Sequence, residues 1–299
     1  MSRKQITRKQ HYIPRLLLKN FCDNDGKLAV YNTKHHTFSR KTPAQICYRN
    51  YLYETKYEFS MDGVKYENYF FLNQIEQKLS ELEAEATDII RKIISLCNDD
   101  LNKEALICSS AEKEKLLRFI LNLFLRNPII MKEYSLDKPQ SNYLSIPDIR
   151  EMKELLDSYD MSDIANQMIV SIQKLFFIFS DTLKNKINTN NITFFVSKES
   201  RLVFSDLPLV FGAVNSDSYV VFAPISPYCC VHYYENKTPH IFRRNKITSL
   251  SKEQTISLNC MLVSAAQHDI RYIYAKDKRE IEETMKYIGE NNDKTRTIN

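Results

Sequence analysis

Glycine is scarce in this chain, and its scarcity excludes several widespread folds and active sites. The 299 residues contain four glycines, whereas average usage of about 7% would give roughly twenty. No two glycines lie close enough together to form a phosphate-binding loop, which needs clustered glycines for close approach of the backbone. The sequence therefore excludes P-loop and Rossmann dinucleotide-binding folds, and also the G-x-S-x-G turn of serine hydrolases.

The order of local patterns predicts an α+β protein. We expect a single domain over residues 1–285, followed by a flexible tail at 286–299. Within it, residues 1–60 are predicted as a basic arm with a β-hairpin at 27–39, and 61–188 as a helical part. Residues 189–277 are predicted as a mostly antiparallel sheet with a late helix. The segment ITFFVSKESRLVFSD is interpreted as two strands around a turn.

Apolar periodicity and capping signals place the helices of the middle part. Apolar residues separated by three and four positions predict a helix over 68–97. Ser109 and Glu112 fit a capping box for a helix over 110–127, and Pro128 ends or kinks it. Two more helices are expected at 146–158 and 162–186, the second capped by Ser162.

Cysteine usage and hydropathy predict a cytoplasmic protein. The seven cysteines form no C-x-x-C pair, so we interpret them as reduced, mostly buried thiols rather than as a zinc site. No apolar run is long enough to cross a bilayer, and the basic opening segment lacks the long apolar region of a signal peptide. No contact with membranes is expected.

Positive charge is concentrated at the N-terminal end. Residues 1–53 hold eleven basic and two acidic residues, which gives +9, while the whole chain carries +5, which leaves −4 for the rest. Such asymmetry favours a surface that meets a polyanion, with a merely solubilising surface as the alternative. We expect nucleic acid to contact the basic side chains near the N-terminus, namely Arg3, Lys4, Arg8, Lys9 and Arg15.

Five polar residues in distant segments are candidates for a site. His11 lies in a basic segment before Pro14, which disfavours a helix there, and Glu76 and Glu83 share one helix face. Arg126 follows an apolar run and needs a partner, either a structural carboxylate or a bound phosphate. Asp206 closes a strand before Pro208, where either a catalytic carboxylate or a turn that satisfies backbone amides fits.

A series of short motifs carries a resemblance to a known family. QHYIPRLLLKNF resembles the HYxP signature of the bacterial domain-of-unknown-function family 4238. The similarity continues, in chain order, through GKLAVYN, IEQKLSELEAEA, LFLRNP, FSDLPL, APISP and LNCMLVSAAQHDIRYIYA, from about residue 10 to about residue 275. Asn127 and Leu207 depart from the family's usual Thr and Asn. The resemblance implies that the five polar residues named above belong to recurring motifs, which is the pattern of a composite site.

The hypothesis that follows is a nuclease-like phosphodiester hydrolase, acting as a toxin or phage-defence effector. In it, Glu76, Glu83 and Asp206 hold Mg²⁺ or Mn²⁺, and His11, Arg126 and Asp206 are the catalytic residues. No nucleotide or organic cofactor is expected. The alternatives are a non-catalytic nucleic-acid-binding protein and a protein-interaction subunit whose basic arm meets an acidic partner. The sequence leaves the oligomeric state open.

Overall fold

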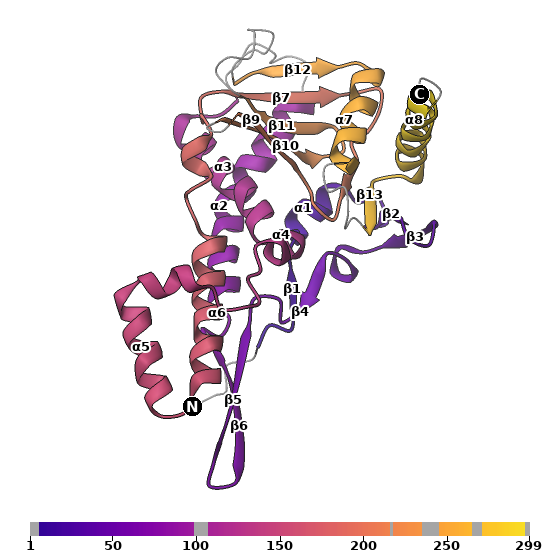
Figure 1. Ribbon diagram of the computed structural model, residues 1–299. Coiled ribbons are helices and arrows are strands. Elements are labelled where there is room, and N and C mark those ends of the chain that lie inside the picture. The colour runs from indigo at the N-terminus through magenta and orange to yellow at the C-terminus, as the bar shows by residue number, and fades with distance from the viewer. Residues whose placement is uncertain (1–5, 99–106, 216–217, 235–244, 265–270, 297–299) are drawn as a thin grey trace. The chain divides into compact units, whose positions relative to one another are not determined.

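The computed structural model describes residues 6–98, 107–215, 218–234, 245–264 and 271–296 (Figure 1). Helices and mostly antiparallel strands are both abundant in it, which confirms the predicted α+β class. The described residues fall into two compact units. Unit 1 comprises 6–12, 48–81 and 125–180, and unit 2 comprises 13–47, 82–124 and the described residues from 181 onward. Each unit therefore draws on three separate segments of the chain.

Unit 1 contains two antiparallel ribbons. Strand β1 (Lys9–His11) pairs with β4 (Tyr48–Asn50), so His11 is extended as predicted. Strands β5 (Thr55–Met61) and β6 (Val64–Phe70) form a hairpin closed by Asp62 and Gly63, both at positive φ. This hairpin corrects the prediction of a helical part from residue 61. Apolar and polar residues alternate over 55–70, and that period of two belongs to a strand.

The helices predicted for the middle of the chain begin later or end earlier than predicted, and α2 is divided between the two units. Helix α2 (Gln74–Asn98) starts six residues after the expected residue 68. Phe71 and Asn73 adopt positive φ, which a right-handed helix does not contain. Helix α4 spans Pro128–Glu133, α5 Pro147–Ser158 and α6 Ser162–Ile178. The N-cap residue of α6 is Met161 rather than Ser162, whose hydroxyl donates to the Asp157 carboxylate at 2.8 Å.

Buried apolar side chains from separate segments hold unit 1 together. Tyr53 and the first turns of α2 contribute to one cluster with side chains from α4, from the residues just after it and from the end of α6. Its buried members are Tyr53, Ile75, Leu79, Met131, Leu136 and Ile178. Burying side chains of this size stabilises a fold by roughly 1.5–3 kcal/mol each.

Unit 2 is built on a five-stranded sheet in the order β12-β7-β11-β10-β9 (Figure 1). The strands are β7 (Ile192–Ser197), β9 (Val210–Asn215), β10 (Ser218–Ser226), β11 (Cys229–Tyr233) and β12 (Ile247–Leu250). Only β12 and β7 run parallel, so the predicted mostly antiparallel sheet is confirmed. Helix α7 (Lys252–Ser264) packs on one face through Leu258 and Leu262. Helix α3 (Ser110–Leu125) contacts β11, where the Tyr233 hydroxyl donates to the Lys113 carbonyl.

A four-stranded sheet in the order β3-β2-β13-β8 completes unit 2. Its strands are β2 (Leu28–Asn32), β3 (Thr37–Lys41), β8 (Phe204–Ser205) and β13 (Tyr272–Ala275). The predicted hairpin of β2 and β3 is confirmed. In contrast, β7 and β8 do not pair around a turn, because each belongs to a different sheet.

The ends of unit 2 are also more regular than expected. Helix α1 (Arg15–Asn20) buries Leu17 and Leu18, whereas Leu16 is half-exposed. Helix α8 (Lys278–Arg296) continues through most of the segment predicted as a flexible tail. In the part of the chain described here, no helix has the length and apolar composition needed to cross a membrane.

Candidate functional site

The HYIP segment places one imidazole at the surface of unit 1. The half-buried ring of His11 lies beside Tyr48, with ring centroids 5.5 Å apart. The His11 carbonyl accepts a hydrogen bond from the Tyr53 hydroxyl at 3.4 Å. The backbone of this residue therefore supports the fold. Its imidazole, a side chain that commonly acts as a general acid or base, remains reachable from solvent.

The LFLRNP motif fixes the start of helix α4. Arg126 is 1% exposed, and its Nε donates to the Tyr12 carbonyl at 3.0 Å. Asn127 is the N-cap residue, whose side-chain oxygen accepts from the Ile129 amide at 3.0 Å, and Pro128 occupies the first helical position. Arg126, Asn127 and Pro128 thus each have a structural role within unit 1.

A buried polar pair in unit 1 escaped the sequence analysis. Gln10 is fully buried and donates to the Glu54 carboxylate at 2.9 Å, while its oxygen accepts from the Tyr53 amide at 2.8 Å. The same carboxylate accepts from the Asn73 amide, which joins the residue before α2 to this network. Burial raises the pKa of Glu54, against the effect of these hydrogen bonds. No sequence spacing links these residues, so no local pattern could have identified the pair.

A pocket of about 320 Å³ lies in unit 1. Leu52, Pro128, Met131 and Leu136 supply its apolar lining, and Arg49, Lys132, Lys174 and Asp137 supply its charged lining. Three cations therefore face one carboxylate. Burial lowers the pKa of Lys174, whose ammonium lies 3.3 Å from the Thr55 hydroxyl and 3.5 Å from the Glu54 carbonyl. Cationic side chains next to an apolar lining can bind a ligand that carries an anionic group on an organic ring or chain.

The predicted metal ligands do not form a ligand group in the structure. Glu76 and Glu83 are half-buried and share a face of α2, but Glu76 belongs to unit 1 and Glu83 to unit 2. Over all described residues, no group of three or more His, Cys, Asp or Glu side chains is arranged to hold a metal ion. We therefore derive no catalytic step through a metal, and a role for Mg²⁺ or Mn²⁺ stays a prediction.

The carboxylate of Asp206 lies in unit 2 and joins two strands. One oxygen accepts from the amides of Arg271 and Tyr272 at 2.9 and 3.0 Å, and the other accepts from the Tyr274 hydroxyl at 2.8 Å. Asn259, on α7, accepts from the Val203 amide and donates to the Arg201 carbonyl, which ties this helix to the segment before β8. Asp206 holds the end of β8 beside β13, in a different sheet from β7.

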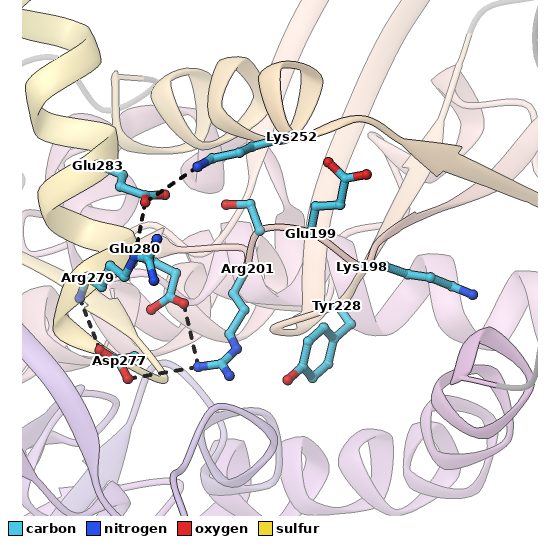
Figure 2. Close-up of a pocket in the computed structure, with 10 residues that line it drawn as sticks. Lys198, Glu199, Arg201, Tyr228, Lys252, Asp277, Arg279, Glu280 and Glu283 are labelled. Carbon is cyan, nitrogen blue, oxygen red and sulfur yellow. Dashed lines mark hydrogen bonds and ion pairs between the residues drawn. The ribbon is translucent and has the colours of Figure 1, made fainter.

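A second pocket, of about 300 Å³, lies in unit 2 (Figure 2). Its cations are already matched by carboxylates: Arg201 lies 3.5 Å from Glu280, and Lys252 and Arg279 both lie near Glu283. Burial raises the pKa of Glu280, although the charge of Arg201 opposes this. Four cationic and four acidic side chains line this pocket, so it offers an anion much less net attraction than the pocket of unit 1.

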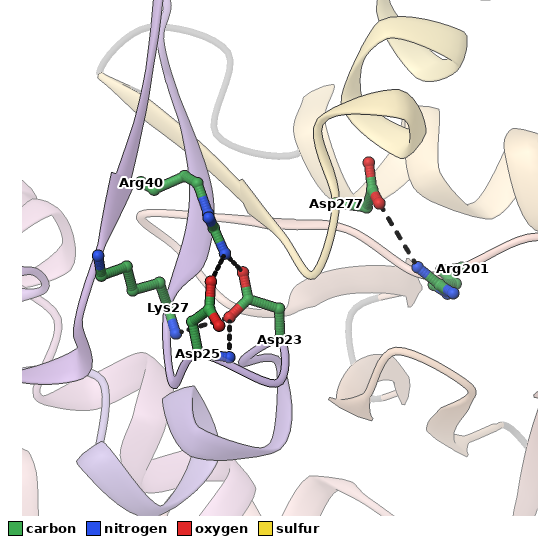
Figure 3. Close-up of polar contacts among 6 residues, drawn as sticks. All are labelled: Asp23, Asp25, Lys27, Arg40, Arg201 and Asp277. Carbon is green, nitrogen blue, oxygen red and sulfur yellow. Dashed lines mark hydrogen bonds and ion pairs between the residues drawn. The ribbon is translucent and has the colours of Figure 1, made fainter.

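Within the basic segment 1–53, here called the N-terminal segment, one arginine binds both acidic side chains. Arg40 lies on β3 and binds the carboxylates of Asp23 and Asp25, while Asp23 also accepts from the amide of Lys27 (Figure 3). The other cations of the N-terminal segment are therefore not neutralised by these two acids. This leaves the excess of positive charge on the remaining basic side chains.

The predicted nucleic-acid contacts are divided between the units. Arg8 and Lys9 are exposed in unit 1, and the Lys9 ammonium lies 4.6 Å from the centroid of the Tyr48 ring. Arg15 is exposed at the start of α1 in unit 2. Arg3 and Lys4 lie outside the described residues. Sequence reasoning missed the pocket cations Arg49, Lys132 and Lys174, because only folding brings these three distant residues to one cavity.

Together these features define an α+β protein with a cation-lined pocket in one unit and a charge-balanced pocket in the other. The chain belongs to the family of proteins of unknown function DUF4238, whose model matches residues 9–279. Among curated proteins and among solved structures, none matches the chain significantly.

Proposed function

We propose that this protein binds nucleic acid through unit 1, with a backbone phosphate held in its cation-lined pocket. The observation that carries the proposal is the convergence of Arg49, Lys132 and Lys174 on one cavity with a single carboxylate, Asp137. Cations at the surface attract the phosphates of nucleic acid and release the counterions condensed on them, which favours binding.

The surroundings of the pocket support a nucleic acid over a small anion. Strand β4 carries Arg49 on one face of the β1–β4 ribbon, and the exposed Lys9 lies beside Tyr48 on the opposite face. A strand that continues from the pocket around this ribbon would meet a second cation and an aromatic ring, which offers a stacking surface for a base. The apolar residues that line the pocket can contact a sugar or base attached to the bound phosphate.

Binding is tested by fluorescence anisotropy with labelled single-stranded DNA, single-stranded RNA and duplex DNA over a range of salt concentrations. The Arg49→Gln/Lys132→Gln variant is expected to bind about ten-fold more weakly and to lower the salt slope by about one per cation removed. Lys174 is left intact because its ammonium contacts the buried chain around Glu54.

Arg150→Gln is the matched control, since Arg150 is an exposed cation of unit 1 outside the pocket. This variant should bind like the unmodified protein. Equal binding by the pocket variant and the control, with an unchanged salt slope, contradicts the proposal.

A nuclease-like hydrolase, acting as a cytoplasmic toxin or phage-defence effector, is the second candidate. The solvent-reachable imidazole of His11, next to Lys9 and Tyr48, favours it. Incubation of plasmid DNA and total RNA with Mg²⁺ or Mn²⁺ should then yield cleavage that His11→Gln abolishes. His11 is more informative here than Asp206, because the Asp206 carboxylate accepts three hydrogen bonds of the fold. If neither the unmodified protein nor His11→Gln cleaves any substrate, the nuclease candidate is rejected and nucleic-acid binding without catalysis is retained.

The third candidate function is that of a protein-interaction subunit, and an experiment can distinguish it from the other two. If the basic surface meets an acidic protein, capture of that protein from a lysate should survive treatment with added nucleases. Loss of all captured material on nuclease treatment instead favours nucleic acid as the partner.

A further inference from the structure

The β5–β6 hairpin has one apolar and one polar face. Side chains alternate between faces along a strand, and the observed register pairs Phe59 with Tyr66 and Met61 with Val64. The apolar face carries Tyr57, Phe59, Met61, Val64, Tyr66 and Phe70, and the polar face carries Lys56, Glu58, Ser60, Lys65, Glu67 and Tyr69. A ribbon with such a division is built to pack against something on its apolar side.

Only the base of the apolar face is covered within the described structure. There the rings of Tyr57 and Phe70 lie 4.4 Å apart, and helix α6 contacts mainly strand β5. Toward the turn, Met61, Val64 and Tyr66 are 57%, 51% and 42% exposed. Two strands alone are at best marginally stable in water, and a third strand or a covering layer is normally needed.

Strand β6 presents an open edge. Among the described strands it pairs only with β5, and every residue from 64 to 68 is exposed. An edge of this kind has unpaired backbone amides and carbonyls that can join another strand. The side chains on that edge decide which strand fits.

Charge on the polar face points to a second copy of the same strand. Glu58 and Glu67 lie opposite each other, and Lys56 binds both, at 2.7 and 2.6 Å. Lys65 is the second lysine on this face, so cations and carboxylates are equal in number there and the face can complement a copy of itself. If β6 pairs antiparallel with β6 of a second copy around Tyr66, Lys65 of each copy faces Glu67 of the other. Centring one residue earlier or later places two lysines or two glutamates opposite each other, which is unfavourable.

We propose that two copies of this chain associate through β6 in that register, forming a continuous four-stranded sheet. The arrangement has twofold symmetry, so the same surface serves both copies. Tyr66 faces Tyr66 of the second copy, and Val64 faces Asn68, which joins the two exposed apolar faces. Backbone pairing satisfies both open edges at once.

Charge-reversal variants test whether β6 pairs with β6 of a second copy. Lys65→Glu sets two glutamates opposite each other, and Glu67→Lys sets two lysines, so each variant alone should raise the dimer dissociation constant at least about ten-fold in sedimentation equilibrium. An equimolar mixture of the two variants should recover dimers, because the copies are then complementary. Arg150→Glu makes the same charge change as Lys65→Glu, but on α5, and should leave the dimer intact. Far-UV circular dichroism verifies that every variant is folded.

A monomeric unmodified protein overturns the proposal, as does a variant mixture that stays monomeric. Register is tested separately in a Cys22→Ser/Cys260→Ser background, which removes the two partly exposed thiols. With oxidised glutathione, Tyr66→Cys should form a disulfide-linked dimer. Asn68→Cys should not, because its two copies lie four residues apart, about 14 Å. Cross-linking at 68 instead of 66 overturns this register.

Discussion

Asp206, Asn259 and Gln10 each bind backbone groups that lie far away in the sequence. Asp206 reaches the amides of Arg271 and Tyr272, and Asn259 reaches the Val203 amide. Buried polar groups in proteins are normally hydrogen-bonded, and leaving one unsatisfied costs about 1–3 kcal/mol. For these motif residues, a structural role is sufficient to account for a polar side chain at the position.

His232 is a buried residue whose ionisation opposes folding at acid pH. It is 2% exposed and lies parallel to Phe222, with ring centroids 4.0 Å apart, and burial lowers its pKa to about 3. The unfolded chain binds a proton below its ordinary pKa near 6.5, whereas the folded chain does not until about pH 3. Stability is therefore complete above about pH 6.5 and is lost as the pH falls toward 3.

The His232→Phe variant should remove this acid sensitivity. Between pH 7 and pH 5 the unmodified protein should lose about 2 kcal/mol through this group, and the variant should lose correspondingly less. Urea denaturation at the two pH values gives the comparison, and Phe fits the stack with Phe222 and Phe195. Equal pH dependence of both proteins would contradict a neutral buried imidazole.

At the scale of elements, a capping pattern in the sequence predicted a helix start correctly where the capping side chains bind the first turn of that same helix. The capping box of α3 is an example: the Ser109 amide donates to Glu112, and the Glu112 amide donates to Ser109. The Lys92 ammonium and the Ser109 amide lower the pKa of Glu112 to about 2. By contrast, Ser162 satisfies the same cap preference, yet its hydroxyl binds Asp157. Helix α6 therefore begins at Ser162 with Met161 as its N-cap residue and without a side-chain cap.

Ser109→Ala should destabilise the protein by about 1 kcal/mol, since the first turn of α3 loses its side-chain acceptor. Ser162→Ala serves as the matched control and should cost less, because Ser162 does not cap α6. Urea denaturation followed by far-UV circular dichroism measures both. A larger loss for Ser162→Ala would contradict the assignment of the caps.

At the scale of the whole molecule, the two units combine segments that are distant in sequence. Residues 6–12 and 125–180 meet in unit 1, and 13–47 meets the C-terminal segments in unit 2. The cysteines follow this burial: Cys47, Cys97, Cys108, Cys229 and Cys230 are buried, and Cys22 and Cys260 are partly exposed.

Thiol titration tests that arrangement. The denatured chain should consume seven equivalents of a thiol reagent. In the folded protein, Cys22 and Cys260 should form the faster phase because they are partly exposed, although partial burial raises the pKa of both thiols. Burial raises the pKa of Cys108 to about 12, so this thiol should react slowly. Cys22→Ser/Cys260→Ser should abolish the rapid phase. A rapid phase that persists in this variant would show that the buried thiols are accessible.

The sequence by itself determined the α+β class, the family, the β2–β3 hairpin and the capped start of α3, because each depends on neighbouring residues or on motif order. It also located the excess of positive charge. Only the tertiary structure decided that Asp206 ties β8 to β13, that Asn259 ties α7 to the segment before β8, and that β7 and β8 join different sheets. It also decided that Arg49, Lys132 and Lys174 line one pocket. These features depend on contacts between segments far apart in the chain, and no local spacing encodes such contacts.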